Sequence, residues 1–199
     1  MMRIITGKAR GTRLDAPKTD KTRPTTEMAK EGVFSSIQFD LEGRTVLDLF
    51  AGSGQLGLEA LSRGASKAVF VDSDAESFEV IKKNAQKTGL YAQCRILRME
   101  YGEYIKAASR EGASFDFIFL DPPYRETVVP ETVKRILKAG LLKPGGRIFC
   151  ESDDPELFGA DNIIPENESF TVKVKEIKVY KYGKTYFHTV CAEQNEADI

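Results

Sequence analysis

The chain has 199 residues, of which 41% are apolar and 30% are charged, a composition typical of a soluble globular domain rather than of a disordered segment. It contains no apolar run of the ~18 residues needed to cross a membrane and no leader-like segment near its start. We therefore expect a cytoplasmic protein with no membrane partner. The cysteines, three in number, form no close pair and His188 is the single histidine, which argues against a disulfide framework and against a metal site.

The net charge of −1 is unevenly distributed along the chain. Residues 1–30 hold eight basic and three acidic side chains, so the rest of the chain is acidic. A basic segment on an acidic body is typical of a surface that contacts phosphates, although a solvated polar lead-in has the same composition. Within this segment, Ile4-Ile5 together with Gly7 and Gly11 predicts a small strand-turn unit.

Apolar periodicity predicts alternating helices and strands after this arm. Alternation of helices and strands is typical of a parallel sheet covered by helices on both faces. The segment at residues 142–146 is expected to be a turn. Helices are expected at residues 25–38, 55–63, 75–88, 101–110 and 131–139, and strands at residues 45–50, 67–71, 93–97, 115–120 and 147–151.

The last part of the chain breaks this alternation. Residues 171–182 and 185–191 have period-two character and are separated by Gly183-Lys184, so they predict an antiparallel hairpin at the edge of the sheet. Its lysines at 173, 175, 178 and 181 either face nucleic acid or protect an edge strand from aggregation, and we favour protection. The expected organisation is a basic arm over residues 1–24, one domain over residues 25–191 and an acidic tail over residues 192–199.

The first candidate site follows the strand at 45–50, in the sequence DLFAGSGQLG. Gly52, Gly54 and Gly57 match G-x-G-x-x-G, a turn that brings the backbone and a helix N-terminus close to a ligand. A turn that serves packing alone has the same pattern. Asp48 favours a ligand with a cationic amino group over a pyrophosphate, which a carboxylate would repel. S-adenosylmethionine has such a group and no phosphate.

Acidic residues at the ends of the next two strands complete this expected cofactor site. Asp72 would accept hydrogen bonds from ribose hydroxyls. Glu100 is placed to accept one from the adenine amine, although an acid at a strand end also serves solubility. The residues predicted to contact the cofactor are Asp48, Ala51, Gly52, Ser53, Gly54, Asp72, Ser73, Glu100, Tyr101 and Asp121.

The second candidate site is Asp121-Pro122-Pro123-Tyr124, directly after the apolar segment FDFIFL. A carboxylate that ends a buried strand is costly unless it has a partner or a use, and the two prolines stiffen the loop. These residues predict a clamp for a planar base, with acceptors for an exocyclic NH2 and an aromatic platform for stacking. A strand stopped by proline is the structural alternative. If the first and fourth strands are neighbours, both sites face one crevice at the carboxyl edge of the sheet.

The chain resembles the class I S-adenosylmethionine-dependent methyltransferases that modify amines, in the segments LDLFAGSGQLGLEALSRGA, FVDSD, IKKNAQKTG and FDFIFLDPPY. The segments MRIITGKARGTRLDAP, TRPTTEMAKEGVFSSI and YKYGKTYF narrow the resemblance to the RsmD family, over about residues 2–190. The resemblance implies a doubly wound, mostly parallel, seven-stranded Rossmann-like sheet with an antiparallel C-terminal hairpin. It also implies S-adenosylmethionine as cofactor and methylation of guanine N2 in 16S ribosomal RNA, free or in an assembling small subunit.

Each part of the chain then has an expected role. Catalysis is assigned to Asp121, Pro122, Pro123 and Tyr124. RNA contacts are assigned to Arg3, Lys8, Arg10, Arg13 and Arg23. We expect a monomer without a metal ion.

Three other functions remain open from the sequence. The same chemistry could act on another amine, such as adenine in DNA or a glutamine amide in a protein, although the basic arm fits nucleic acid better. A nicotinamide-dependent oxidoreductase would also use G-x-G-x-x-G, but Asp48 and the scarcity of proton donors argue against it. A catalytically silent RNA-binding module is the third alternative, and the intact Asp121–Tyr124 motif argues against that.

Overall fold

The structure, a computed structural model, describes residues 2–18, 27–122, 125–159 and 172–194, without the side chains of residues 125–127. The chain divides into two compact units, residues 1–101 and residues 102–199. Within the described ranges, no helix is both long and apolar enough to cross a membrane.

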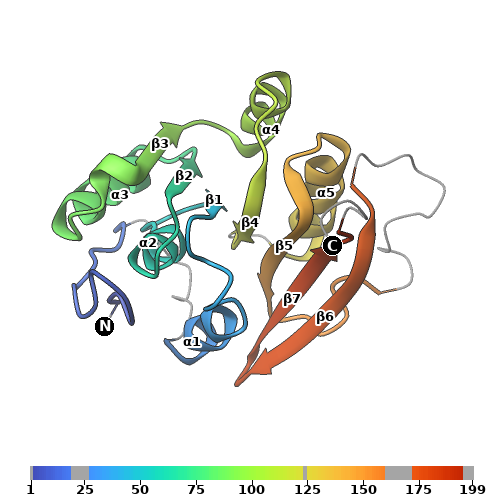
Figure 1. Cartoon of the computed structure of the whole chain (residues 1–199), viewed down its shortest axis with the longest axis horizontal. Helices are drawn as coiled ribbons and strands as arrows, with labels where there is room; N and C mark the ends of the chain where they lie inside the picture. The colour runs from blue at the N-terminus through green and yellow to red at the C-terminus, as the bar shows by residue number, and fades with distance from the viewer. Residues whose placement is uncertain (1, 19–26, 123–124, 160–171, 195–199) are drawn as a thin grey trace. The chain divides into compact units, whose positions relative to one another are not determined.

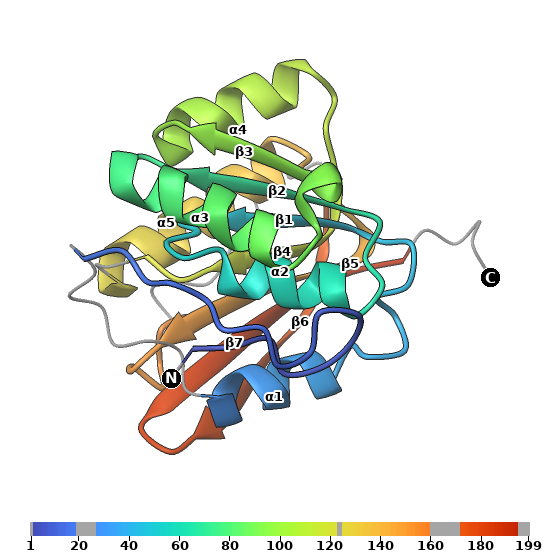
Figure 2. The same ribbon diagram turned by 90° about the vertical axis from the view of Figure 1, so that its left-hand side faces the viewer.

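The first unit is built on three parallel strands, in the order β3-β2-β1. The strands are β1 (Thr45–Leu49), β2 (Lys67–Asp72) and β3 (Cys94–Arg98), and the helices are α1 (Glu27–Ser35), α2 (Gln55–Ser62), α3 (Ala75–Lys87) and the 3₁₀ helix η1 (Tyr91–Gln93). Helix α2 packs on β1 and β2, and α3 packs on β2 and β3. Every residue of α2 is buried, because the N-terminal arm covers this helix on the side away from the strands (Figure 2).

The second unit combines parallel and antiparallel pairs. Its elements are α4 (Tyr101–Arg110), which begins at the junction, β4 (Phe115–Leu120), α5 (Arg125–Lys138), β5 (Leu142–Ser152), β6 (Val174–Tyr182) and β7 (Thr185–Ala192). Strands β4 and β5 are parallel, whereas β7 pairs antiparallel with both β5 and β6. All of β4 is buried, and the rings of Phe119 and Phe149 stack with centroids 5.4 Å apart.

The strands form a seven-stranded mixed sheet in the order β3-β2-β1-β4-β5-β7-β6 (Figure 1). The hairpin β6–β7 closes one edge, with Gly183 in the turn at a φ of 65°. The predicted α/β class, the seven strands and the antiparallel C-terminal hairpin are therefore confirmed.

Helix α1 ends at Ser35, three residues earlier than expected, and β6 begins at Val174. Two other predicted elements differ more from the structure. Helix α5 begins at Arg125, six residues earlier than expected, and Pro130 lies inside it. The proline forgoes one helical hydrogen bond, and the fully buried face that includes Val129 and Val133 offsets that loss. The expected turn at 142–146 lies within β5, where the pairing with β4 shifts register around Gly145, whose φ is 70°.

Candidate cofactor site and N-terminal arm

The loop that follows β1 reverses the chain and leads into α2. Phe50, Gly52 and Gly54 have φ angles of 73°, 53° and 76°, a region that glycine enters at no steric cost and that phenylalanine enters only under constraint. The constraint comes from β2, because the N–H groups of Phe50 and Ala51 both donate to the Val71 carbonyl at 3.0 Å. The loop is therefore fixed to the neighbouring strand before α2 begins.

Asp48 lies beneath this loop and not at its surface. It is 3% exposed, and its Oδ2 accepts a hydrogen bond from the N–H of Gly57 at 2.9 Å. A Cβ at position 57 would overlap the ring of Phe70, so glycine is needed for α2 to approach β2 this closely. Asp48 and the third glycine of the motif thus jointly seat the first turn of α2, a structural role that the sequence alone did not assign to Asp48.

Asp72 bridges the loops that follow β1 and β2. Its Oδ2 accepts from the N–H of Gly52 at 2.8 Å, and its Oδ1 accepts from the N–H of Asp74 at 2.9 Å. Asp74 in turn caps α3 by accepting from the N–H of Ser77 at 2.7 Å, and this bond lowers the pKa of the Asp74 carboxyl. Gly52 and Asp72, both predicted to bind the cofactor, are therefore in direct contact.

An aromatic pair lies next to the glycine-rich loop. The rings of Phe50 and Tyr101 have centroids 5.0 Å apart and planes at 45°, a favourable tilted geometry. Both rings are half-buried, and the neighbouring Glu100 is exposed. The sequence prediction included Glu100 and Tyr101 but missed Phe50, although an aromatic residue directly before Ala51-Gly52 was the available signal.

The remaining residues predicted for the cofactor belong to the same unit. Ala51 and Ser53 are buried, Gly54 occupies the N-cap position of α2, and Ser73 is exposed, with its carbonyl accepting from Nε of Arg98 at 3.4 Å. No lysine or arginine occurs from residue 45 to residue 62. The loop therefore offers the carboxylate of Asp72 and backbone groups to a ligand and no cationic side chain.

The second predicted site begins at the end of β4. Asp121 is half-buried and Pro122 is buried, whereas Pro123 and Tyr124 lie outside the described residues. At the opposite end of the same strand, the carboxylate of Asp116 pairs with the ammonium of Lys143 at 2.8 Å. The strand thus carries one carboxylate at each end, and the catalytic role of the one at Asp121 stays a prediction.

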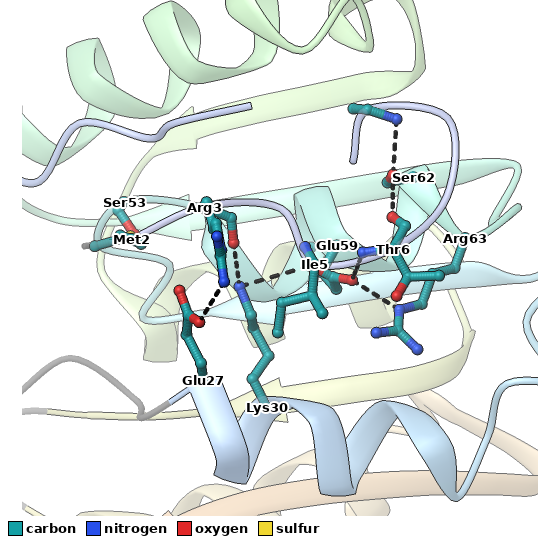
Figure 3. Close-up of polar contacts among 12 residues, drawn as sticks. Met2, Arg3, Ile5, Thr6, Glu27, Lys30, Ser53, Glu59, Ser62 and Arg63 are labelled. Atoms are coloured by element: carbon teal, nitrogen blue, oxygen red, sulfur yellow. Dashed lines mark hydrogen bonds and ion pairs between the residues drawn. The ribbon is translucent and has the colours of Figure 1, made fainter. Parts of the chain in front are cut away.

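The N-terminal arm packs along α2 and doubles back on itself near Gly7 (Figures 2 and 3). It therefore has two legs, the first containing Arg3 and the second containing Arg13. An antiparallel bridge between Arg3 and Arg13 joins the legs. Near the tip, Gly7 has a φ of 86°, and a Cβ there would overlap the Ser62 carbonyl at the end of α2. Arg23 lies outside the described residues, and the other side chains predicted to bind RNA are all exposed: Arg3, Lys8, Arg10 and Arg13.

Glu59 anchors the arm, a role that the sequence prediction missed. Its side chain is fully buried in the middle of α2. It accepts from the N–H groups of Ile5 at 2.8 Å and Thr6 at 3.0 Å and from Nε of Arg63 at 2.8 Å, and it lies 3.5 Å from the ammonium of Lys30 (Figure 3). A buried carboxylate needs such partners. The only sequence signal was a glutamate inside the apolar segment QLGLEALS.

Lys30 joins α1 to this cluster. It is 1% exposed, and its ammonium donates to the Arg3 carbonyl at 2.7 Å. Burial lowers the pKa of Lys30, and the carboxylate of Glu59 opposes that shift. The pair therefore ties α1, α2 and the arm together without exposing either charge to solvent.

The sheet order, the glycine turn after β1 and the acidic end of β2 define the class of protein. The solved structure of the Escherichia coli yhhF protein matches with a TM-score of 0.74 and 26% identity, covering 98% of this chain and 99% of that one. A Bacillus cereus O-methyltransferase solved in complex with SAH shares the fold at a TM-score of 0.63 and 15% identity, covering 88% of this chain and 84% of that one. The chain has the fold of the Rossmann-like methyltransferases.

Sequence comparison gives the particular family. Residues 2–188 match the family described as Conserved hypothetical protein 95. The YlbH protein of Bacillus subtilis is 36% identical over 85% of this chain and 94% of its own length. The ribosomal RNA small subunit methyltransferase D of Escherichia coli is 34% identical over 76% of this chain and 75% of its own length. The chain belongs to this family, the RsmD family of methyltransferases.

Proposed function

We propose that this protein transfers the methyl group of S-adenosylmethionine to the exocyclic N2 amine of a guanine in 16S ribosomal RNA. Relatives support an RNA substrate through their names, among them the ribosomal RNA small subunit methyltransferase D of Haemophilus influenzae, 32% identical over 83% of this chain and 84% of its own length. The observation that carries the proposal is the contact of Asp72 with the glycine-rich loop, beside the Phe50–Tyr101 pair.

The residues at this loop fit S-adenosylmethionine better than a dinucleotide. Asp72 places a carboxylate at a loop without basic side chains, and the carboxylate of Asp48 is buried beneath that loop. Negative charge at this place disfavours a pyrophosphate and favours a cationic amino group. Asp72 would accept hydrogen bonds from the ribose, and the rings of Phe50 and Tyr101 would contact the adenine. When bound, S-adenosylmethionine supplies an electrophilic methyl group on its sulfonium.

Asp121 would orient the acceptor amine. It follows a fully buried strand, and the buried Pro122 biases its backbone towards an extended conformation. Its carboxylate would accept a hydrogen bond from the guanine NH2, align the nitrogen for attack and stabilise the positive charge that develops there. The same carboxylate would accept the proton that the amine loses. Tyr124 would stack on the base.

The most direct test of the substrate is mass mapping of RNA. Purified protein would be incubated with S-adenosylmethionine and unmodified 16S ribosomal RNA, both free and in assembling small-subunit particles, and the RNA would then be digested. We expect one guanosine to gain the mass of a methyl group and to co-elute with N2-methylguanosine. Methylation of another base, of a ribose or of a ribosomal protein would contradict the proposed substrate.

The role of Asp121 has a separate test. Asp121→Ala is expected to lower the single-turnover rate about 100-fold, the scale of one lost group that stabilises developing charge, while cofactor affinity changes little. Tyr124→Ala should likewise lower the single-turnover rate and change cofactor affinity little. Asp116→Asn is the matched control, because it changes a carboxylate at the other end of β4, and its rate should stay near that of the wild type. Normal methyl transfer by Asp121→Ala would remove this residue from the mechanism.

A further inference from the structure

Both legs of the N-terminal arm end beside one residue of the glycine-rich loop. The N–H of Leu14 donates to the Met2 carbonyl at 3.0 Å, so the ends of the two legs lie together. Ser53 contacts the first leg directly, since its hydroxyl donates to the Met2 sulfur at 3.0 Å (Figure 3). Its contact with the second leg runs through a side chain of α3.

That side chain is Asn84, which is 0% exposed. Its Nδ2 donates to the carbonyl of Ser53 and to the carbonyl of Asp15, both at 2.9 Å, and its Oδ1 accepts from the N–H of Asp15 at 2.9 Å. A carboxamide has two N–H donors and one oxygen acceptor, so each of these groups is used. Asn84 therefore bonds the cofactor loop and the arm at the same time.

The bridge satisfies backbone groups of both segments. Loss of the Asn84 amide would leave the Ser53 carbonyl without this partner in a buried place, and the carbonyl and N–H of Asp15 without it in a part-buried one, which is costly. The rest of the loop is held differently, because Phe50 and Ala51 bond to β2. Ser53 is thus the point of the loop whose position depends on the arm.

The middle of the arm is held independently of this bridge. Glu59 accepts from Ile5 and Thr6, and Ser62 accepts from the N–H of Ala9 through its hydroxyl at 3.0 Å. A change at Asn84 should therefore leave the arm docked on α2. It should affect only the connection between the ends of the arm and the loop.

We propose that Asn84 is a positioning residue that couples the arm to the cofactor loop. A ligand that orders Ser53 orders the second leg of the arm through Asn84, and a ligand held by the arm in turn orders Ser53. Coupling of this kind is reciprocal, and it operates through order rather than through a large movement. The inference rests on the proposed function, because it takes S-adenosylmethionine to bind at this loop.

Hydrogen exchange with S-adenosylhomocysteine as the probe tests the coupling without any RNA. Calorimetry first establishes saturation of the wild-type protein. We then expect amide exchange in the peptide that contains Asp15 to slow about fivefold on binding, the lower end of typical coupling between sites. Unchanged exchange in the saturated wild type would overturn the coupling and leave the proposed function standing. Absence of binding by the wild type would overturn both, so the two failures are distinguishable.

Two variants assign the effect to Asn84. Asn84→Asp keeps the side-chain volume and the acceptor for the N–H of Asp15 but removes both donors. We expect it to bind S-adenosylhomocysteine and to lose the ligand-dependent slowing. Asp15→Asn is the matched control, because it breaks the ion pairs with Lys83 at 2.7 Å and Lys87 at 2.5 Å and leaves the backbone groups that Asn84 contacts. It should keep the slowing. Full slowing in Asn84→Asp would exclude Asn84 as the coupling residue, and the wild-type result holds even if this variant fails to fold.

Discussion

Two basic regions of the chain, the arm and the hairpin β6–β7, differ in how their backbones are held. In the hairpin, β6 pairs with β7 from Val174 to Tyr182 with one register shift near Glu176, so the facing N–H and C=O groups of the two strands are bonded within the hairpin. In its described residues the arm has one β-bridge, between Arg3 and Arg13, and a few backbone hydrogen bonds of its own, such as that from the N–H of Ile4 to the Thr12 carbonyl at 3.0 Å. Its N–H groups at Ile5 and Thr6 bond to the carboxylate of Glu59 instead. The hairpin is held by its own strand pairing, whereas the arm depends in part on hydrogen bonds to α2.

Because the two backbones are held differently, an excess of basic residues indicates a different role in each region. The hairpin lysines are exposed on an edge strand, where Lys178 pairs with Glu176 at 3.0 Å and the ammonium of Lys181 lies 5.5 Å from the centre of the Tyr186 ring. An edge strand needs such charges to resist pairing with other chains whether or not it binds a ligand. Residues 2–18, the described part of the arm, have no exposed edge of comparable length to protect, so the excess of basic side chains there favours a ligand with phosphates.

The largest expected effect comes from removing the anchor of the arm. Glu59→Ala leaves Lys30 and Arg63 without their carboxylate, and loss of one partner from a buried charge cluster costs about 3–5 kcal/mol. Urea unfolding should show this loss, and limited proteolysis should then cut the arm. Glu79→Ala, at an exposed glutamate that pairs with Lys82 at 3.2 Å, is the control and should stay within about 0.5 kcal/mol of the wild type. Wild-type stability in Glu59→Ala would mean that the arm, like the hairpin, holds itself.

A smaller effect is expected at the loop against which the ends of the arm lie. Asp72→Ala should weaken S-adenosylmethionine binding by about 1.5–3 kcal/mol, the worth of hydrogen bonds to a charged group. Part of the loss should come from the N–H of Gly52, which Asp72 holds in place. Asp74→Asn is the control, because asparagine caps a helix as well as aspartate does, and cofactor affinity should not change. Normal affinity of Asp72→Ala in calorimetry would contradict the ribose assignment.

Most of the fold was predictable because its signals are local. Helix α4 and strand β4 have the predicted bounds, since each shows a clear apolar period over consecutive residues. Helix α5 was predicted too short because Pro130 resembles a helix boundary, and only the buried packing of its apolar face shows why the helix continues. The start of β5 was assigned to a turn for a related reason, because Gly145 has a turn conformation inside a strand with shifted register.

In the candidate site, too, the residues with local sequence signals could be predicted and those with distant partners could not. Asp48, Gly52, Gly54 and Asp72 could be proposed as candidates because they lie at or just after the ends of consecutive strands in a recognisable spacing. Glu59 and Asn84 were not found, since the residues of the arm that bond to them are 53 to 69 positions away along the chain. The sequence therefore indicates candidate ligand contacts more readily than it indicates the residues that hold those candidates in place.

A comparison of salt dependence would show which of the two basic regions binds RNA. Replacing Arg10 and Arg13 together by Ala should weaken RNA binding and reduce its log–log salt slope by roughly one to two, since each lost phosphate contact removes about 0.7–0.9. The affinity for S-adenosylhomocysteine alone should not change. The hairpin double variant, Lys175→Ala with Lys181→Ala, is the control and should keep the wild-type slope. The opposite pattern would place the RNA on β6.

The smallest effect concerns the buried titratable group of the hairpin, His188 on β7. Its Nε2 lies 2.9 Å from the Asp154 carbonyl, and its Nδ1 has no hydrogen-bond partner within the described part of the chain, in contrast to the full set of donors around Glu59. Burial lowers the pKa of His188 below its ordinary value of 6.5. The unfolded chain therefore takes up a proton before the folded one does, and stability should fall as the pH drops below 6.5 towards the folded pKa. His188→Gln should lose less stability than the wild type between about pH 7.5 and about pH 5.5 in urea unfolding. Equal losses in the two proteins would show that His188 titrates alike in the folded and unfolded chain.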